Sequence, residues 1–595
     1  MLIFYILYDI IKKKYKGWKT KMKKIMSKLL IPCAIIFLLV CIFIGIFLYK
    51  HFSPNNAHAD ISKNYGLITD EQVAVILNAN FEESQGTLID GDVYLNYKFI
   101  HKNLNSRLYW DSNENKLLYT TNKDLIMVSP DSSNYLVNRT NTNFNKKIVV
   151  TSGDNCYINV NFIKKFSNFD YKFYKNPSRI VLTTEFKNLD YCSSEKSTQI
   201  RVLGGIKSPI LKDLNSGESL RLIKKYDNWS KVMSSDGIIG YVKNSALSDV
   251  TKKDLKTNFK KEHFTHKLLN STINMAWHQV TSPAANSKIS SVLASTKKVN
   301  VISPTWFSLN DNNGNLKSVA SIDYVNYCHK QNIQVWALYS NIENKNVDTS
   351  YVLTHTSTRH NLVNQIISQA IQYNIDGINL DFESLNGSKV GDSYIQFVRE
   401  LSLKCKDNHL ILSVDNYTPA NYTRFYNIKE QANFADYICI MAYDEHTSGS
   451  PSAGSTASYS WVNSGIEKTL NDVPSNQVIM GIPFYSRLWF KPLSNVNDSS
   501  DTNGYKIKST LGLVAMSKLV TDTKTTKKWL SDEGQYYIQY KDNENLYKVW
   551  IEDNKSISKK LNIVNKKKLA GAAYWKLGFE DQSTWDTIVK TLKLK

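Results

Sequence analysis

Two carboxylates and an amide share one face of a segment that otherwise has the composition of a buried strand, YNIDGINLDFESLN, from Tyr373 to Asn386. Side chains of a β-strand alternate between its two faces. One face of this segment is apolar and carries Ile378, Leu380 and Phe382. The other carries Gly377, Asn379, Asp381 and Glu383. An unpaired buried carboxylate is costly, so a purely structural strand would avoid this pattern, and it indicates acid–base chemistry.

Asp381 and Glu383 have the types and the spacing that general acid catalysis requires. Glu383 stands at the end of the predicted strand and is the candidate proton donor. The negative charge of Asp381, two residues earlier, would raise the pKa of Glu383 by like-charge proximity. A raised pKa keeps the proton available for transfer to a leaving group at neutral pH.

Eight strand-like apolar runs follow one another after residue 268, with amphipathic, helix-like intervals between several of them. They begin near residues 273, 299, 333, 376, 409, 436, 477 and 569. A βα alternation repeated eight times predicts an α/β fold, a (β/α)₈ TIM barrel over 268–595. The last gap is too long for one crossover, so we expect a small α+β insertion at about 490–550. Active sites of such barrels lie at the carboxyl ends of the strands, where Asp381 and Glu383 stand.

Four motifs, in the order of the strands, resemble those of family 18 glycoside hydrolases. Asp376, Gly377, Asn379, Asp381 and Glu383 look like the family's D-G-x-D-x-D-x-E signature. MAYD at 441–444, GIPFYSRLW at 481–489 and GAAYW at 571–575 are similar to its motifs on the sixth, seventh and eighth strands. The resemblance covers the predicted barrel and implies a chitinase-like or spore-cortex-type hydrolase.

The resemblance also implies substrate-assisted catalysis, in which the 2-acetamido oxygen of the sugar attacks the anomeric carbon and configuration is retained. Glu383 would then protonate the glycosidic oxygen, and Asp381 would hold the acetamido N–H and stabilise an oxazolinium-like intermediate. Tyr443 would hydrogen-bond the acetamido carbonyl. Asp444 would contact the same sugar, and Trp575 would form an apolar floor beneath its ring. The substrate must therefore carry an N-acetylated sugar.

Asn379 departs from the commonest family pattern, which has aspartate at this position. An amide cannot share a proton as a carboxyl does, so we expect Asn379 to donate a hydrogen bond to Asp381 and to alter the pH profile without abolishing catalysis. The same asparagine occurs in relatives that resemble spore-cortex and wall hydrolases, which favours peptidoglycan as the substrate. Asp376 projects to the opposite face of the predicted strand from Asn379, Asp381 and Glu383. It is either a structural hydrogen-bond acceptor or a functional residue.

Further side chains at the strand ends are expected to meet the substrate. By family position these are Asp415, Asn416 and Tyr417 after the fifth strand and Tyr485 and Arg487 after the seventh; Glu445 and His446 line the cleft. Trp277, Trp306 and Trp336 are sugar platforms or barrel core. The histidines show no H-E-x-x-H or paired spacing, so neither a metal nor another cofactor is expected.

The N-terminus carries a candidate membrane anchor. Leu29 to Tyr49 is a run of 21 residues without a charge, long enough to cross a bilayer. Nine lysines precede it, between Lys12 and Lys28, which places residues 1–28 in the cytoplasm and the rest of the chain outside the cell. The alternative is a cleaved signal peptide, because AHA at 57–59 resembles a small-x-small cleavage site. The length of the apolar run favours a retained anchor.

Two accessory modules are predicted between the anchor and the barrel, after a linker at 50–65. An internal echo, GDVYLNYKFIHKNLN from Gly91 and GDNCYINVNFIKKFSN from Gly153, indicates two copies of a small α+β unit in 66–195. This region resembles the copper-amine-oxidase N-terminal-like module, without histidines at metal-ligand spacing. Residues 196–250 resemble a bacterial SH3-type domain, with a hairpin turn at Asp236-Gly237, and act as a spacer or bind glycan or peptide. A second linker follows at 251–267.

The bulk composition fits a multidomain, surface-exposed protein. The 595 residues are 42% hydrophobic and 12% aromatic, and the formal net charge is +21. The lysines are dispersed and no nucleic-acid module is recognisable, so the charge suits anionic wall polymers rather than nucleic acid. Of the seven cysteines only Cys156 and Cys192 are candidates for a disulfide.

The sequence thus predicts a membrane-tethered, retaining glycosidase that cleaves β-1,4 bonds next to N-acetylglucosamine in peptidoglycan. Chitin or chito-oligosaccharide is the alternative substrate. A non-catalytic glycan-binding barrel is the alternative function, but lectin-like relatives typically lose the terminal glutamate, and Glu383 is present.

Overall fold

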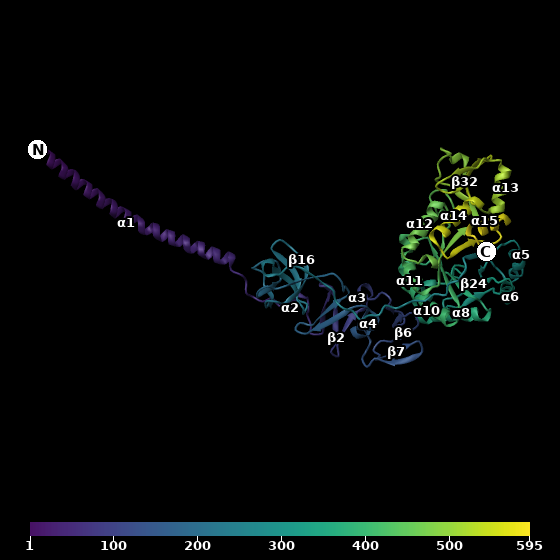
Figure 1. Cartoon of the computed structure of the whole chain (residues 1–595), viewed down its shortest axis with the longest axis horizontal. Helices are drawn as coiled ribbons and strands as arrows, with labels where there is room; N and C mark the ends of the chain where they lie inside the picture. Colours follow the sequence, from purple (N-terminus) through teal and green to yellow (C-terminus); the bar gives the residue numbers. More distant parts are fainter. The chain divides into compact units, whose positions relative to one another are not determined.

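The computed structural model describes all 595 residues, and they form two compact units (Figure 1). The first contains Met1–Phe99 and Tyr157–Phe259, and the second contains Ile100–Cys156 and Lys260–Lys595. The chain therefore passes from the first unit to the second, returns, and leaves again. These units cut across the predicted boundaries at 66–195 and 196–250.

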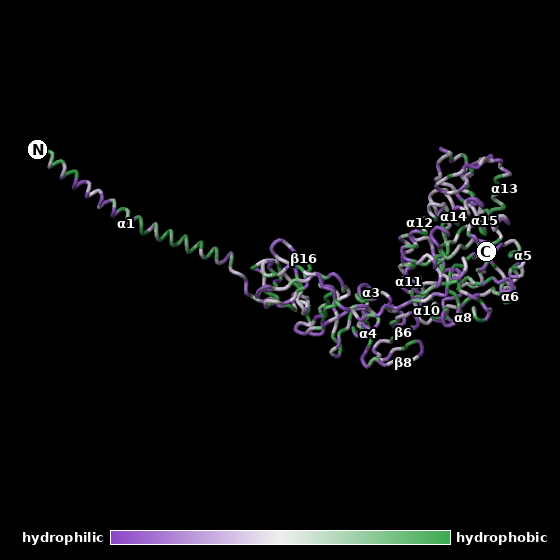
Figure 2. The backbone as a smooth tube through the Cα atoms, in the orientation of Figure 1, coloured by the Kyte–Doolittle hydropathy of each residue, from purple (hydrophilic) through white to green (hydrophobic).

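The N-terminal helix α1 (Leu2–Phe52) has no buried residue. It is long and apolar enough to cross a membrane, a property that a signal sequence near an N-terminus shares. Figure 2 shows the continuous hydrophobic stretch in its second half, with hydrophilic residues before it. At 1.5 Å per residue the uncharged stretch is about 30 Å long, which matches the hydrocarbon core of a bilayer.

The first accessory sheet contains the predicted internal echo. Six of its seven strands run in the order β11 (Asp170–Tyr174), β12 (Arg179–Thr183), β1 (Gln72–Leu77), β2 (Asn80–Ile89), β3 (Asp92–Asn96) and β10 (Asn155–Asn159). β3 leads into α3 (Tyr97–Asn103) and β10 into α4 (Val160–Phe166). The two echoed strands pair antiparallel, with Leu95 opposite Ile158. Each copy is thus a strand followed by a short helix.

The second accessory sheet is antiparallel and has seven strands. In order they are β15 (Ile210–Leu214), β14 (Thr198–Arg201), β18 (Ile239–Lys243), β17 (Trp229–Met233), β16 (Ser219–Lys225), β13 (Leu189–Ser193) and β19 (Thr251–Lys253). The hairpin predicted at Asp236-Gly237 joins β17 to β18, and Gly237 has the positive φ of +85° that favours glycine. β13 and β19 extend the sheet beyond the predicted range of 196–250. Cys156 and Cys192 are both free thiols, so the disulfide that we considered is absent.

A third sheet, antiparallel and five-stranded, belongs to the barrel-containing unit. It comprises β4 (Tyr109–Asp111), β5 (Lys116–Thr120), β6 (Leu125–Val128), β7 (Asn134–Val137) and β8 (Thr140–Asn143). The predicted α+β module of 66–195 included these residues. Hydrogen bonds made by β4 and β5 dock this sheet on the barrel helices α8 (Thr356–Gln372) and α10 (Ser393–Asp407). Arg107, just before β4, forms an ion pair with Glu430 of α11 (Ile428–Phe434).

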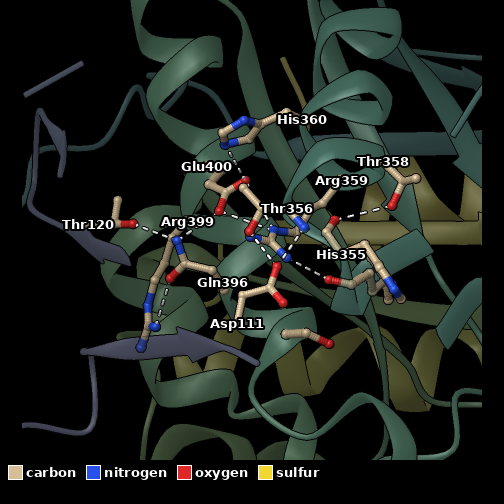
Figure 3. Close-up of polar contacts among 12 residues, drawn as sticks. Asp111, Thr120, His355, Thr356, Thr358, Arg359, His360, Gln396, Arg399 and Glu400 are labelled. Atoms are coloured by element: carbon tan, nitrogen blue, oxygen red, sulfur yellow. Dashed lines mark hydrogen bonds and ion pairs between the residues drawn. The ribbon is translucent and has the colours of Figure 1, made fainter. Parts of the chain in front are cut away.

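Buried polar groups make this docking specific (Figure 3). Asp111, which is 1% exposed, accepts hydrogen bonds from the backbone N and the hydroxyl of Thr356, at 2.7 and 2.5 Å, where α8 begins. The Gln396 amide of α10 donates to the Thr120 hydroxyl at 3.0 Å. Behind them the fully buried Arg359 contacts Glu400 at 3.1 Å, and its guanidinium lies 5.2 Å from the centre of the Tyr109 ring. The β4–β8 sheet is therefore a structural part of the barrel domain.

Replacing Arg359 with methionine is expected to lower the free energy of unfolding of the barrel unit by about 3–5 kcal/mol, because it leaves the Glu400 carboxylate buried without its main partner. Lys518→Met is the matched control, because Lys518 forms an exposed i,i+4 pair with Asp522 that contributes about 0.5 kcal/mol or less. Chemical denaturation followed by tryptophan fluorescence measures both variants. Similar losses of stability in the two variants would contradict the structural weight given to Arg359.

Eight parallel strands form the predicted barrel. They are β20 (Ile273–His278), β21 (Val301–Pro304), β24 (Gln334–Ser340), β25 (Gly377–Asp381), β26 (Ile411–Tyr417), β27 (Tyr437–Met441), β28 (Val478–Pro483) and β34 (Gly571–Trp575). Each pairs in parallel with the next, and β34 pairs with β20 and closes the barrel. The helices between the strands include α5 (Ile289–Ala294), α6 (Ile322–Lys330), α7 (Thr349–Thr354), α8, α10, α11, α12 (Tyr459–Leu470) and α14 (Asn554–Lys567), and α15 (Gln582–Leu592) follows β34. The predicted fold class is confirmed.

The alternation along β25 separates packing from chemistry. Ile378 and Leu380 belong to the large core between the strands and the helices. The opposite face of β25 points into the barrel, where Trp277, Trp336 and Tyr437 form an inner core. A Cβ at Gly377 would lie only 2.8 Å from the Trp336 ring, so this position requires glycine. Asn379 and Asp381 thus stand above a packed inner layer.

The predicted insertion runs from β29 to β33. It contains β29 (Tyr485–Pro492), β30 (Lys506–Gly512), α13 (Leu513–Thr523), β31 (Lys528–Leu530), β32 (Gln535–Lys541) and β33 (Asn545–Ile551). The strands form a five-stranded antiparallel sheet in the order β30-β29-β33-β32-β31. Its first strand follows directly on β28, so Tyr485 and Arg487 stand where the insertion leaves the barrel.

Candidate active site

A cleft of about 530 Å³ opens at the carboxyl ends of the barrel strands. Asp381, Glu383 and Trp575, which the sequence predicts to act together, all line it. Its other lining residues include Gln279, Thr305, Phe307, Lys317 and Glu343. Phe307 and Lys317 lie on a hairpin of β22 (Phe307–Leu309) and β23 (Leu316–Ser318), which forms one wall. The fold thus brings the predicted proton donor, its acidic neighbour and an indole ring into one cavity.

The backbone of Glu383 is fixed by the loop that follows β24. The Glu383 N–H donates to Asn341 Oδ1 at 2.7 Å, and Asn341 Nδ2 donates to the Glu383 carbonyl at 3.0 Å. Burial raises the pKa of the half-buried carboxyl; a hydrogen bond to Tyr417 lowers it, and the charges of Asp444 and Glu343 raise it again. The net pKa is above that of an ordinary glutamic acid. A carboxyl with a raised pKa keeps its proton to a higher pH than an ordinary glutamic acid, which suits a proton donor.

Asp381 is a buried carboxyl with a free oxygen. It is 9% exposed, and its Oδ1 has no hydrogen-bond partner. Burial raises its pKa well above the ordinary value, and the charges of Asp415, Glu383 and Glu343 raise it further. Unpaired buried polar atoms are rare in native proteins and call for an explanation. Here the free oxygen is available to a donor that enters the cleft.

The amide of Asn379 does not donate to Asp381, contrary to our expectation. Trp277 Nε1 and the Ser303 hydroxyl both donate to Asn379 Oδ1 at 2.8 Å. The two donors fix the orientation of the amide, and Asn379 Nδ2 then donates to Asp415 Oδ1 at 2.7 Å. The sequence could not reveal this arrangement, because Trp277 and Ser303 come from two other strands.

Four residues after the sixth and seventh strands form a second cluster. Asp444 has a φ of +62°, a left-handed conformation that aspartate tolerates better than most residues. Its Oδ1 accepts hydrogen bonds from the Tyr485 hydroxyl and from Arg487 Nη2, both at 2.5 Å. The ring of Tyr443 lies 6.5 Å from the ring of Tyr485. The predicted group of Tyr443, Asp444, Tyr485 and Arg487 is therefore assembled in space.

Of the tryptophans considered as sugar platforms, three are core residues. Trp277, Trp306 and Trp336 are at most 2% exposed. Trp277 supports the site from below, because its ring lies 5.9 Å from that of Trp575 and 6.3 Å from that of Tyr443. Trp575 is half-buried and lines the cleft, as does the buried Trp306.

Two residues predicted to bind substrate use their hydrogen bonds inside the protein. Asn416, 2% exposed, forms a reciprocal amide pair with Gln431, at 2.8 and 2.9 Å. Both carboxylate oxygens of Glu445 accept hydrogen bonds from Ser458, at the start of α12. Asp376 accepts from the Val335 N–H and pairs with His329. These contacts position strands and helices, and they leave no polar group of Asn416 free for a sugar.

Glu343 was missed by the sequence reasoning. It lines the cleft, accepts a hydrogen bond from the Ser340 hydroxyl at 2.5 Å, and adds to the charge that acts on Asp381 and Glu383. The only signal in the sequence is the polar run SNIEN at 340–344, directly after the third strand. That run is not part of any of the four motifs that resemble family 18 glycoside hydrolases.

Known families match both halves of the chain. The family described as Glycosyl hydrolases family 18 matches residues 237–580, more than half of the chain. The Copper amine oxidase N-terminal domain matches residues 77–181. The second match coincides with the echoed region, as predicted from the resemblance.

Curated relatives are similar over the barrel. An uncharacterized glycosylase, YvbX of Bacillus subtilis, is 26% identical over 310 residues, which are 50% of this chain and 85% of the relative. A cortical fragment-lytic enzyme of Bacillus subtilis is 25% identical over 284 residues, 46% of this chain and 63% of the relative. The chain thus spans less than two thirds of that enzyme. The crystal structure of the Bacillus cereus spore cortex-lytic enzyme SleL is 19% identical and covers 64% of this chain and 89% of its own, with a TM-score of 0.48.

Proposed function

Because this chain belongs to the family 18 glycosyl hydrolases, we propose that it cleaves the β-1,4 bond that follows N-acetylglucosamine in peptidoglycan, with Glu383 as the general acid. The observation that carries the proposal is the placement of Glu383, Asp381 and Trp575 in one cleft. The raised pKa of Glu383 supports its role, because the acid must still hold its proton when the glycan binds.

The chemistry follows the substrate-assisted course that is general to the family. Glu383 protonates the glycosidic oxygen while the acetamido oxygen of the sugar attacks the anomeric carbon from the opposite face. The acetamido N–H, which becomes more acidic as positive charge develops, donates to the free Oδ1 of Asp381. Tyr443 donates to the acetamido group, and Trp575 packs beneath the pyranose ring. Water then opens the oxazolinium with Glu383 as the base, and configuration is retained.

Peptidoglycan is the substrate favoured by three observations. The cortical fragment-lytic enzymes among the relatives are named for their action on spore cortex. The hydrophobic α1 offers a membrane anchor, and the lysines before it orient the barrel toward the cell wall. Lys317 on the hairpin wall of the cleft is exposed and forms no ion pair. In peptidoglycan the lactyl group of N-acetylmuramic acid is amide-linked to a stem peptide, whose carboxylates can pair with Lys317, whereas chitin carries no anion.

The test is digestion of purified peptidoglycan and of chito-oligosaccharides by the full chain in detergent, with Glu383→Gln as the blank. Mass analysis should find new reducing-end N-acetylglucosamine in the peptidoglycan fragments. Release from chito-oligosaccharides alone would transfer the assignment to chitin, for which chitinase relatives provide a precedent. Binding of glycan without new reducing ends would indicate a glycan-binding barrel.

Lys317→Gln is expected to lower kcat/KM on peptidoglycan by about threefold to fivefold, the effect of one exposed ion pair, and to leave hydrolysis of chito-oligosaccharides unchanged. The effect on peptidoglycan should shrink at high salt, because an exposed pair is screened. Lys518→Gln on the insertion helix, remote from the cleft wall, is the control. Equal losses on the two substrates would show that Lys317 does not recognise a carboxylate of the stem peptide.

A further inference from the structure

The inner face of the barrel carries a second aspartate beside the signature strand. In the parallel pairing of β25 with β26, Leu380 is opposite Val414, so Asp381 and Asp415 occupy the next positions along the two strands. Directly opposed residues of neighbouring strands project to the same face, about 5 Å apart at the backbone. Both carboxyls face the barrel interior, and both are buried, with 9% and 2% exposure.

The surroundings of Asp415 contain donors but no compensating cation. Asn379 Nδ2 donates to Asp415 Oδ1 at 2.7 Å, and the Cys439 thiol acts as a second donor that lowers the pKa of this carboxyl. The titratable groups that act on the two aspartates are Glu383, Glu343, Cys439, Tyr443 and Tyr394. Each of them is neutral or anionic. Two carboxylates cannot both be ionised here without a large penalty, so the pair retains a proton.

We propose that Asp415 is the proton-sharing partner of Asp381, a positioning residue supplied by the neighbouring strand while Asn379 occupies the place of the usual signature aspartate. The proposal deepens the proposed function and rests on it for the chemistry of Asp381. In the free protein one proton is shared between the two carboxyls. When the acetamido N–H binds the Asp381 carboxylate, the proton stays on Asp415. No covalent bond forms or breaks in this step.

The electrostatics agree with this arrangement. Burial raises the pKa of Asp415 to about 7, against the hydrogen bonds from Asn379 and Cys439, which lower it. Burial and the charge of Asp415 raise the pKa of Asp381 well above its ordinary value. Such a pair titrates as a unit, in two steps. Asn379, held by two donors, orients Asp415 and cannot itself take the proton.

Asp415→Asn tests the proposal. The variant keeps the volume of the side chain, and its amide oxygen still accepts from Asn379. We expect kcat to fall by about 10- to 100-fold, as for other groups that act through a catalytic residue, with little change in KM. We also expect the ionisation near pH 7 to disappear from the pH profile of kcat. In the exchanged variant Asn379→Asp/Asp415→Asn the carboxyl returns to the signature strand, and kcat should recover to within about fivefold of the natural protein, a rescue that loss of packing would not allow.

A second measurement does not depend on activity. Infrared difference spectra of the full chain in detergent, between pH 5 and pH 9, should show the carbonyl band of a buried carboxylic acid that disappears near pH 7. The band should be lost in Asp415→Asn. An unchanged pH profile and an unchanged infrared band in this variant would overturn the assignment of Asp415. A natural protein that releases no reducing ends would overturn the proposed function instead, and the infrared band would still decide the protonation of the pair.

Discussion

Replacing Glu383 with glutamine is expected to lower kcat on peptidoglycan by at least about a thousandfold, within the range that positioned proton donors contribute. Glutamine keeps the size of the side chain and the backbone hydrogen bonds to Asn341, so the fold should be unaffected. Because glutamine cannot donate the proton, the leaving sugar would have to depart as an alkoxide. Reducing-end release from peptidoglycan measures the loss.

A substrate with a better leaving group separates acid catalysis from binding. A nitrophenyl glycoside of an N-acetylglucosamine oligomer needs little protonation, so Glu383→Gln should lose far less activity on it than on peptidoglycan. The natural protein should lose activity as the pH rises through the raised pKa of Glu383, because only the protonated form donates. Glu467→Gln, which changes an exposed glutamate paired with Lys567, is the control. A Glu383→Gln variant with a tenth of the natural activity on peptidoglycan would rule out the role assigned to Glu383.

Replacing Asp381 with alanine is expected to lower kcat by about 10²- to 10³-fold, because the positive charge of the oxazolinium then develops without its anion. The loss should be equally large on the nitrophenyl glycoside, since a better leaving group does not replace stabilisation of the intermediate. This pattern distinguishes Asp381 from Glu383.

The stability of the Asp381 variant provides a second check. Asp381 Oδ1 has no partner in the free protein, and its neighbours Asp415, Glu383 and Glu343 are all carboxyls. Removing a buried acid that has one oxygen without a donor and only carboxyls as charged neighbours should therefore leave the melting temperature unchanged or raise it, as often occurs when a functional group is deleted from an active site. A lower melting temperature together with near-normal turnover would assign Asp381 a structural role.

The barrel and the centre of its cleft could be predicted from local patterns. The eight apolar runs and the helix-like intervals between them were enough to locate the barrel strands. The alternation of strand-like and helix-like segments can be read directly from the sequence. Glu383 and Trp575 could be placed at the cleft because each ends a strand, and the ends of parallel strands meet at one edge. The environment that raises the pKa of Glu383 also depends on Asp444 and Glu343, which come from other loops.

The directions of individual side chains could not be predicted in this way. Asn379 faces Asp415 because an indole and a hydroxyl from two other strands occupy its oxygen. The side-chain amide of Asn416 is hydrogen-bonded to Gln431 of the following helix. The association of the β4–β8 sheet with the barrel depends on Asp111 reaching Thr356, 245 positions away in the sequence. Contacts of this kind are set by tertiary packing and leave no periodic signal.

The route of the chain bears on how a protease could separate the barrel from the first unit. The chain crosses between the two units near residues 99, 156 and 259, so three covalent strands connect them. A protease that cuts once near residue 259 does not free the barrel, because residues 100–156 remain joined to the first unit at both ends and bound to the barrel through Asp111, Thr120 and Arg107. Separation would require either three cuts or one cut followed by dissociation of the buried polar contacts between residues 100–156 and the barrel, so a single nick does not release the barrel.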